Sequence, residues 1–389
     1  MERLKELLHA PATGGILLLL MSILAVGIAN SGWSEAYTSF LHLMLGPLSV
    51  ELWVNDVLMA IFFLGVGLEV KHEMLEGELN THAKRFLPTI AALMGVLAPA
   101  LVYAAFNYSD AELLRGWAIP TATDIAFSIG IISLVGTRAP LAAKVFLTTL
   151  AVVDDLIAVI IIAAVYTTTF NFAFMGGALA IFILLLIFNK KNVVSPWPYA
   201  ILGIALWFCI FKSGLHATLA GVILAMTIPS RVWKGDKEIL PLNQWHHALA
   251  LWITFLIVPL FGFVNAGVSF GDFQSSDLFH PVVLGIALGL FLGKQIGIFG
   301  IMLVLVKSKL VKLPNQLTWT HMYGVALCCG VGFTMSLFVN LLALEPGHTQ
   351  ELAKVGIFLG SIVSGVLGYV VLRYVAPECE VIETDDFYE

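Results

Sequence analysis

Charged residues are scarce in this chain: they make up 12% of its 389 residues, whereas hydrophobic residues make up 59%. A soluble domain usually carries about a quarter charged residues and less than half apolar ones. The apolar runs recur along nearly the whole chain, and the loops between them are too short to fold independently. The composition therefore excludes a soluble globular protein and predicts a polytopic membrane protein.

Signals for enzymatic or nucleic-acid chemistry are missing as well. The sequence contains no glycine-rich phosphate loop and no basic patch with interleaved aromatic residues. The stretch HEMLE at 72–76 lacks the second histidine of a zinc-protease motif, because Glu76 stands in its place. Neither metal nor disulfide spacing relates the four cysteines, Cys209, Cys328, Cys329 and Cys379. We expect no cofactor, no nucleic-acid partner and no enzymatic activity.

The apolar runs predict an all-α protein of about twelve transmembrane helices. Lipid leaves backbone amides no partner outside a helix or a closed barrel, and the period-2 alternation of barrel strands is missing. We expect a single domain over 1–389, with its membrane region at about 11–375 and an acidic cytoplasmic tail at 376–389. The approximate cores of the spans are 14–29, 54–72, 87–106, 117–135, 145–166, 173–188, 198–211, 214–229, 248–268, 281–306, 320–342 and 355–375.

The distribution of basic residues orients these spans in the bilayer. Of the 20 lysines and arginines, 16 fall at the two ends of the chain or in every second loop. Only three fall in the opposite loops, and Lys294 lies inside a span. By the positive-inside rule, both termini are predicted to be cytoplasmic.

Four charged residues lie at membrane depth: Asp124, Asp154, Asp155 and Lys294. Each costs at least about 2.5–3.5 kcal/mol at the centre of a bilayer. A buried ion pair that joins two helices is the structural alternative, but one lysine cannot pair with three aspartates. The surplus of negative charge indicates a site for a cation, and carboxylate, hydroxyl and carbonyl oxygens suit a hard cation.

The adjacency of two of these aspartates is informative. Neighbouring residues on a helix point about 100° apart, so Asp154 and Asp155 cannot face one partner equally. One of them can turn toward Lys294 while the other faces a cavity that it shares with Asp124.

Two spans contain signs of a broken helix. In the fourth, Pro120 removes a backbone donor, and Thr121 and Thr123 place hydroxyls next to Asp124. In the eleventh, the stretch CCGVGFTMS weakens the helix through its small and polar residues Gly330, Gly332 and Thr334. Interrupted helices in corresponding parts of two halves are typical of a transport site. Ordinary glycine and proline in membrane helices are the alternative.

The chain also resembles a known family, and the likeness runs in order from residue 11 to about residue 375. It is similar to the NhaA family of bacterial sodium/proton antiporters. The rule on interrupted helices was drawn in part from this same family, so the two indications are not independent. The stretches that carry the resemblance are LWVNDVLMAIFFLGVGLEVKHE (52–73), GWAIPTATDIAF (116–127), VDDLIAVIII (153–162), KSGLHATLAG (212–221), PLFGFVNAGV (259–268), GKQIGI (293–298) and CGVGFTMSLF (329–338).

The resemblance implies a fold and a site. The third to fifth spans and the tenth to twelfth would form an inverted repeat, with the broken helices crossing in mid-membrane. Na⁺ or Li⁺ would bind Asp155 and Asp124, with Thr123 nearby, and Asp154 would pair with Lys294. The protein would lie in the bacterial inner membrane and serve sodium and pH homeostasis.

Competition for the same oxygens explains how such a site exchanges ions. A buried carboxylate near like charge holds protons more readily than a free one, so H⁺ and Na⁺ exclude each other. If the empty, charged site cannot reorient, each crossing carries one or the other. Adjacent carboxylates allow more than one H⁺ per Na⁺, which makes the cycle electrogenic. Asp154 or Lys294 is the second proton carrier, and the sequence does not decide between them.

Four residues are candidates for a pH response: Glu69, His72 and Glu73 at the cytoplasmic end of the second span, and His216 at the start of the eighth. Histidines titrate between pH 5 and 8 and can gate function. Solvated charges at helix ends are the alternative.

Two departures from the family pattern limit these expectations. His246 stands where an acidic residue is expected and Ala250 where a histidine is, which leaves the pH profile open. The first external loop, 31–52, is shorter than in relatives that form a dimer contact there. We expect a reduced strand pair within HLMLGPLSVEL; a homodimer is compatible with the sequence, and its geometry stays open.

Three other classes of membrane protein are alternatives to an antiporter. An intramembrane aspartyl protease needs a GxGD-type context, which this chain lacks. A cation channel needs a continuous charged or carbonyl-lined pore rather than acids paired with a lysine. A sodium-coupled solute symporter of similar architecture is the remaining alternative, and it requires a wider pocket.

Overall fold

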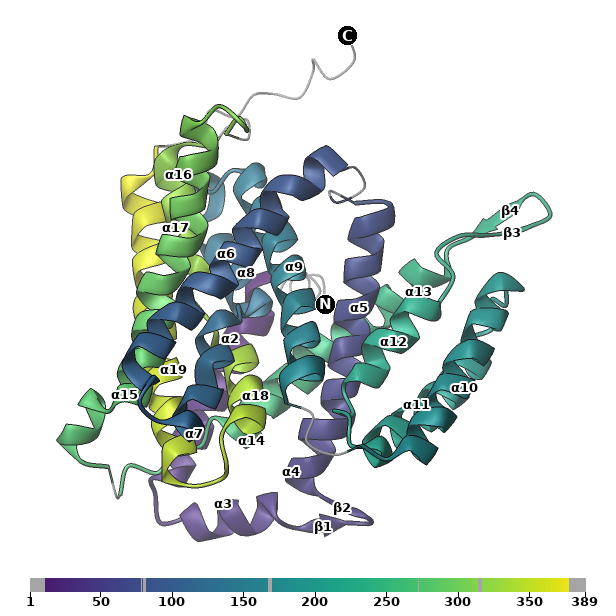
Figure 1. Cartoon of the computed structure of the whole chain (residues 1–389), viewed down its shortest axis with the longest axis horizontal. Coiled ribbons are helices and arrows are strands. Elements are labelled where there is room, and N and C mark those ends of the chain that lie inside the picture. The colour runs from purple at the N-terminus through teal and green to yellow at the C-terminus, as the bar shows by residue number, and fades with distance from the viewer. Residues whose placement is uncertain are drawn as a thin grey trace, which may run out of the picture.

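The computed structural model describes residues 11–77, 79, 82–166, 170–271, 273–313 and 317–377. Nearly all of these residues are helical, apart from connecting loops and two short hairpins (Figure 1). Cys379 and all but the first two residues of the predicted acidic tail lie outside the described residues.

The helices follow the predicted spans in order. The α-helices are α2 (Pro11–Ala29), α3 (Ser34–Leu41), α4 (Val50–Leu52), α5 (Met59–Leu75), α6 (His82–Asn107), α7 (Ala111–Leu114), α8 (Ile125–Val135), α9 (Leu141–Val165), α10 (Phe172–Lys190), α11 (Pro196–Ser213), α12 (Leu219–Thr227), α13 (Pro241–Trp252), α14 (Val258–Asn265), α15 (Pro281–Leu288), α16 (Gly300–Lys307), α17 (Trp319–Cys328), α18 (Phe333–Ala343) and α19 (His348–Val370). Turns of 3₁₀ helix lie at Arg115–Thr121, Gly136–Arg138 and Ser275–Phe279, and π-helical turns lie at Trp53–Leu58, Ile253–Ile257, Gly289–Gly293, Gln295–Phe299 and Val371–Val375.

Every one of the twelve predicted spans overlaps one or more helices, but the helices differ in how well each could cross a membrane. Among the described residues, eight are long and apolar enough by themselves, and up to ten if each of two bent pairs is one span. The bent pairs are α2 with α3, at 118°, and α17 with α18, at 43°. The two remaining predicted spans correspond to α11 and to the nine-residue α12. The chain is an all-α polytopic membrane protein.

The helices gather in two groups. The broken helices α7–α8 and α17–α18 lie among α6, α9, α15, α16 and α19, whereas α5 and α13 pack with α10, α11 and α12 (Figure 1). Each half of the first group consists of a long helix, a broken helix and another long helix. This order agrees with the inverted repeat that the resemblance implies; the repeat itself stays a prediction.

Two antiparallel hairpins connect helices. Strand β1 (Met44–Leu45) pairs with β2 (Leu48–Ser49) around Gly46, whose φ of +70° favours glycine. This is the reduced strand pair predicted in the first external loop. Strands β3 (Val232–Lys234) and β4 (Lys237–Ile239) form a second hairpin, which the sequence analysis did not predict.

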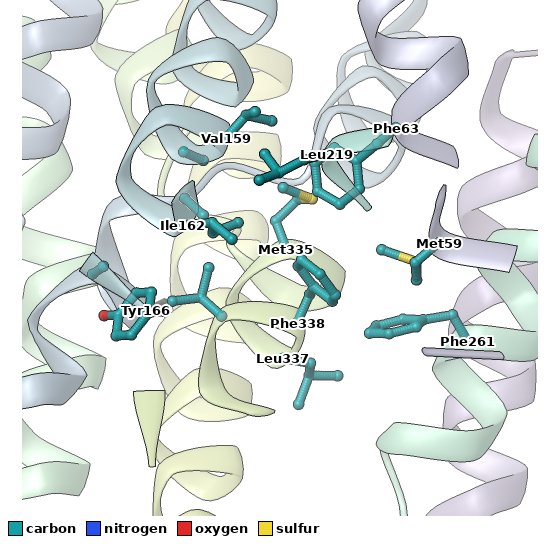
Figure 2. Packing of buried hydrophobic residues seen from close by; sticks show 14 of the residues in the cluster. Met59, Phe63, Val159, Ile162, Tyr166, Leu219, Phe261, Met335, Leu337 and Phe338 are labelled. Carbon is teal, nitrogen blue, oxygen red and sulfur yellow. The ribbon is translucent and has the colours of Figure 1, made fainter. Parts of the chain in front are cut away.

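Aromatic and sulfur-containing side chains fill the space where the two groups meet. Figure 2 shows Met59 and Phe63 from α5, Phe261 from α14 and Phe338 from α18 converging there. The ring centroids of Phe63 and Phe338 are 5.3 Å apart, and those of Phe261 and Phe338 are 6.3 Å apart. Such edge and tilted contacts stabilise a dense core.

A stripe of glycines brings α6 close to the tenth span. Gly285, Gly289, Gly293 and Gly297 recur every four residues and therefore lie on one helix face. A Cβ at Gly293 would lie 2.5 Å from the Cα of Pro99 in α6, and one at Gly297 would meet the Met94 carbonyl oxygen. Small residues at this spacing permit close backbone packing in membranes. The four-residue spacing of these glycines is visible in the sequence, but the sequence does not show that α6 is their packing partner.

We expect Gly297→Ala to destabilise the protein by roughly 1–3 kcal/mol, because α6 must shift to admit the methyl group. The measurement is thermal unfolding in detergent. Gly300→Ala is the matched control in the next helical turn, since a Cβ there would meet nothing within 4 Å. Equal stability of the two variants would contradict the packing role of the stripe.

Candidate ion-binding site

The fourth span is interrupted beside its buried aspartate. Arg115–Thr121 forms a 3₁₀ segment that contains Pro120, the backbone at Ala122 is extended, and α8 begins only after Asp124. The backbone N–H of Asp124 donates to the Val331 carbonyl (2.7 Å), so the two broken helices meet at this point. The residues predicted to break this span and the eleventh therefore lie together.

The eleventh span breaks where its glycines are. A Cβ at Gly330 would lie 2.6 Å from the Leu290 carbonyl oxygen, and one at Gly332 would lie 3.0 Å from that of Ala122. The N–H groups of Gly332 and Phe333 donate to Ser361 Oγ in α19, both at 3.2 Å. Glycine thus permits the crossing, and a neighbouring hydroxyl accepts from amides that the broken helix leaves open.

Asp124 joins the two broken helices. Its side chain caps α8, with Oδ1 accepting from the Phe127 N–H (2.9 Å). Its Oδ2 accepts from both the N–H (3.0 Å) and the hydroxyl (2.5 Å) of Thr334, at the start of α18. Asp124 is 1% exposed. The hydroxyl of Thr123 instead donates to the Cys329 carbonyl (3.0 Å).

Asp154 and Lys294 form a buried ion pair. Lys294 Nζ lies 2.9 Å from Asp154 Oδ2, and the two side chains are 0% and 1% exposed. Lys294 stands between the π-helical turns Gly289–Gly293 and Gln295–Phe299. In this irregular stretch Gln295 Nε2 donates to the Phe291 carbonyl (2.7 Å) and so satisfies a backbone acceptor.

Asp155 differs from its neighbour in forming no ion pair or hydrogen bond through its carboxylate with the residues that the structure describes. It is 1% exposed, and neither of its carboxylate oxygens accepts a hydrogen bond from the residues that the structure describes. A buried carboxylate in this state is costly unless a proton or a cation neutralises it. The one-residue step along α9 directs Asp154 to Lys294 and places Asp155, but not Asp154, on the wall of a cavity.

A cavity of about 220 Å³ is lined by both Asp124 and Asp155. Glu69 of α5 and His246 of α13 contribute its polar wall beyond the aspartates. Its lining residues are Phe62, Gly65, Val66, Glu69, Asp124, Ile125, Ala126, Asp155, His246, Ala250, Ile253, Thr254, Val258, Thr334 and Met335. Asp155 and Asp124 therefore share one cavity.

The four candidates for a pH response do not form one cluster. Glu69 lines the cavity of the aspartates, and His72 and Glu73 follow on the next turn of α5. His216 lies before α12, where its ring packs against Phe338 at 5.5 Å. The structure thus joins only Glu69 directly to the site.

Several hydroxyl groups that were not predicted as site residues connect the two broken helices to each other and to α19. Ser128 Oγ donates to the Cys328 carbonyl (2.8 Å), and Ser336 Oγ donates to the Ile119 carbonyl (2.7 Å). Ser361 accepts from the eleventh span. Serine and threonine at a helix interruption were the available signal, but their partners lie far along the chain.

Two broken helices that cross beside buried carboxylates and a cavity are the fold and site of a secondary ion transporter. Comparison with known proteins identifies the family. The sequence profile described as "Na+/H+ antiporter 1" matches residues 5–372. The chain belongs to this family of Na⁺/H⁺ antiporters, the NhaA family.

Individual relatives agree with this assignment along their whole length. The chain is 50% identical over 371 residues to the Na(+)/H(+) antiporter NhaA of Caulobacter vibrioides, covering 95% of this chain and 90% of that one. It is 49% identical over 388 residues to the NhaA of Pseudomonas entomophila, covering 97% of each. It is also 49% identical over 385 residues to the NhaA of Mesorhizobium japonicum, covering 98% and 96%.

Proposed function

We propose that this protein exchanges cytoplasmic Na⁺ or Li⁺ for external H⁺, with the cation bound by Asp155 and Asp124. The observation that carries the proposal is the state of Asp155, a fully buried carboxylate with two unshared oxygens on a small cavity. Carboxylate oxygens are ligands for a hard cation, and they are also the atoms that take up H⁺. Proton and cation therefore compete for one place.

We infer that the exchange is electrogenic because more than one H⁺ crosses for each Na⁺. Lys294 neutralises Asp154, so Asp124 and Asp155 supply the negative charge that a single Na⁺ only partly offsets. One H⁺ at the empty site gives that same net charge, so a second H⁺ per cycle is what makes the two crossings differ by one unit of charge. The second proton is carried by the Asp154–Lys294 pair, on one or the other partner.

Access from one side at a time follows from how the cavity ends. Glu69 and Met335 line the cavity, whereas Met59, Phe261 and Phe338 pack together beyond Met335 (Figure 2). By the distribution of basic residues, the Glu69 end faces the cytoplasm. This arrangement supports alternating access with the external side closed.

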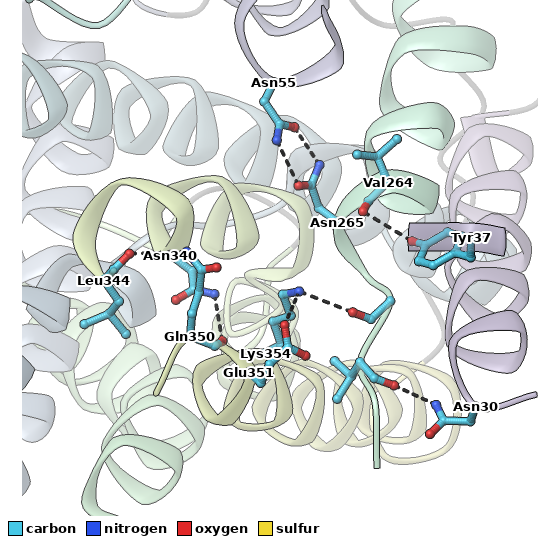
Figure 3. Close-up of polar contacts among 12 residues, drawn as sticks. Asn30, Tyr37, Asn55, Val264, Asn265, Asn340, Leu344, Gln350, Glu351 and Lys354 are labelled. Atoms are coloured by element: carbon cyan, nitrogen blue, oxygen red, sulfur yellow. Dashed lines mark hydrogen bonds and ion pairs between the residues drawn. The ribbon is translucent and has the colours of Figure 1, made fainter. Parts of the chain in front are cut away.

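Polar contacts strengthen the closed side. The side-chain amides of Asn55 and Asn265 donate to each other, at 3.1 and 2.7 Å (Figure 3). Nearby, Lys354 Nζ donates to the Gly267 carbonyl (3.2 Å) and to Glu351 Oε1 (2.7 Å). Opening the external side requires these hydrogen bonds to break and the side chains packed around Phe261 and Phe338 to separate at the same time.

The setting of the transporter completes the proposal. We assign the chain to the bacterial inner membrane as a single transmembrane domain with both termini in the cytoplasm, where it serves sodium and pH homeostasis. A homodimer is part of this proposal.

The size of the cavity favours an antiporter over a solute symporter. Pockets for organic ligands usually measure about 300–1,000 Å³. The cavity at Asp155 measures about 220 Å³ and extends along a path lined by apolar side chains as well as by Glu69 and His246. Na⁺-dependent H⁺ flux without any organic solute is the result that separates the two functions.

Competition predicts how the transport constants depend on pH. If a proton must leave before Na⁺ binds, the apparent KM for Na⁺ falls about tenfold for each unit by which the pH rises, over the range in which the empty site is mostly protonated. The measurement uses everted membrane vesicles with an acidified interior, in which added Na⁺ dissipates the pH gradient. A KM that stays constant from pH 6.5 to 9, with only the maximal rate changing, would contradict competition. No response to Na⁺ or Li⁺ at any pH would contradict the exchange itself.

A further inference from the structure

The hydrogen bonds of Asp124 leave little room for an ion. A carboxylate offers about four lone-pair directions, and three are occupied by donors from two different helices. Phe127 N–H contributes from α8, and the N–H and hydroxyl of Thr334 contribute from α18. Asp155, in contrast, has two unshared oxygens on the same cavity.

Of the three donors on Asp124, only the Thr334 hydroxyl can turn away. The two N–H groups belong to the first turns of α8 and α18 and are held by the backbone. A hydroxyl has one donor and two acceptor positions, and rotation about its C–O bond exchanges them. Thr334 is itself 5% exposed and lines the cavity together with Asp124 and Asp155.

We propose that Thr334 is a positioning and ion-selecting residue of the transport site. In this structure its hydroxyl donates to Asp124 Oδ2. When Na⁺ binds, the hydroxyl rotates, frees Oδ2 for the cation and offers its own oxygen as a further ligand. This inference rests on the proposed function and adds a ligand from the eleventh span to the two aspartates.

The same hydroxyl connects ion binding to the arrangement of the broken helices. The 2.5 Å bond from Thr334 Oγ1 to Asp124 Oδ2 joins α18 to α8 across 210 residues of sequence. When the hydroxyl gives up this bond for a contact with the cation, α8 and α18 lose that hydrogen bond as the site is filled. Thr334 thereby couples the binding of a cation to the contact between α8 and α18.

The test compares Thr334→Val, which is nearly isosteric but has no hydroxyl, with Thr334→Ser, which keeps it. We expect Val to raise the KM for Na⁺ by roughly 10- to 100-fold, as expected for loss of a bond to a charged group. We expect Ser to restore KM to within about threefold of the wild type, and Val to change the ratio of the KM values for Na⁺ and Li⁺. Thr334→Ala replaces Val if the latter does not fold.

Ser128→Ala is the matched control, because it removes another bond between the broken helices, to the Cys328 carbonyl, without touching a carboxylate. We expect it to leave KM unchanged and to lower thermal stability only. The inference is overturned if Val keeps the wild-type KM, or if Ser is as defective as Val. The proposed function fails separately, if wild-type vesicles show no Na⁺-dependent H⁺ flux and the purified protein binds no ²²Na⁺.

Discussion

Asp155→Asn is expected to abolish Na⁺- and Li⁺-dependent H⁺ exchange, with a loss of at least about 100-fold, and to leave the protein folded. The reason is that Asp155 is the buried carboxylate with two unshared oxygens. An asparagine at this position has one oxygen, carries no charge and cannot take up or release a proton. Na⁺ flux in everted vesicles, measured beside the wild type at pH 8, is the direct test.

The stability of the same variant gives an independent measurement. A buried charge without a partner is destabilising, and a neutral amide at the same place is less so. We therefore expect the thermal midpoint of Asp155→Asn in detergent to equal or exceed that of the wild type, while transport is lost. Such an exchange of activity for stability is typical of functional sites. Destabilisation of Asp155→Asn with exchange retained would show that Asp155 is a structural residue.

Lys294→Ala is expected to destabilise the protein by about 3–5 kcal/mol, because it leaves the carboxylate of Asp154 buried and unpaired. The Lys294–Asp154 pair has an N···O distance of 2.9 Å and is shielded from solvent on both sides. Moreover, Asp154 Oδ1 has no hydrogen-bond partner among the described residues, so no second contact compensates for the lost lysine. Thermal unfolding in detergent measures the effect.

A double-mutant cycle isolates the pair from the rest of the site. Asp154→Asn removes the charge that Lys294→Ala leaves behind, so we expect the double variant to regain much of the lost stability. If Lys294→Ala is as stable as the wild type, the ion pair does not hold these helices together.

A second double variant of the pair addresses the second proton. In Asp154→Asn with Lys294→Gln, both partners are neutral and neither carries a proton across. Retained exchange that no longer responds to the membrane potential would assign the second proton to the pair. Exchange that still responds would exclude it.

Many features of this protein can be predicted from short stretches of its sequence. Long apolar runs predict helices, because lipid leaves the backbone no other partner, and the lysines and arginines of the loops orient them. The price of a charge in the membrane singles out Asp124, Asp154, Asp155 and Lys294. The interruptions at 122–124 and 329–332 follow from glycine, proline and threonine in otherwise apolar runs. Each of these inferences needs only a few neighbouring residues.

The limits of local reasoning appear in the helices themselves. The sequence predicts a span at 214–229, but the helix there, α12, covers only Leu219–Thr227. Residues before it form turns after Gly214, whose φ of +90° ends α11. The glycine stripe of the tenth span was visible as a spacing, yet its partner, α6, was not.

Sequence alone determined that this is a membrane protein with a surplus of buried acid and two broken helices. The pairing of Lys294 with Asp154, which the family resemblance implied, is seen directly only in the tertiary structure, and only the structure shows that Thr334 holds Asp124 and that Glu69 shares the cavity of the aspartates. The physical reason is distance along the chain. The Lys294–Asp154 and Thr334–Asp124 contacts join residues 140 and 210 positions apart. Such contacts depend on how whole helices pack, and no pattern within a single helix specifies them.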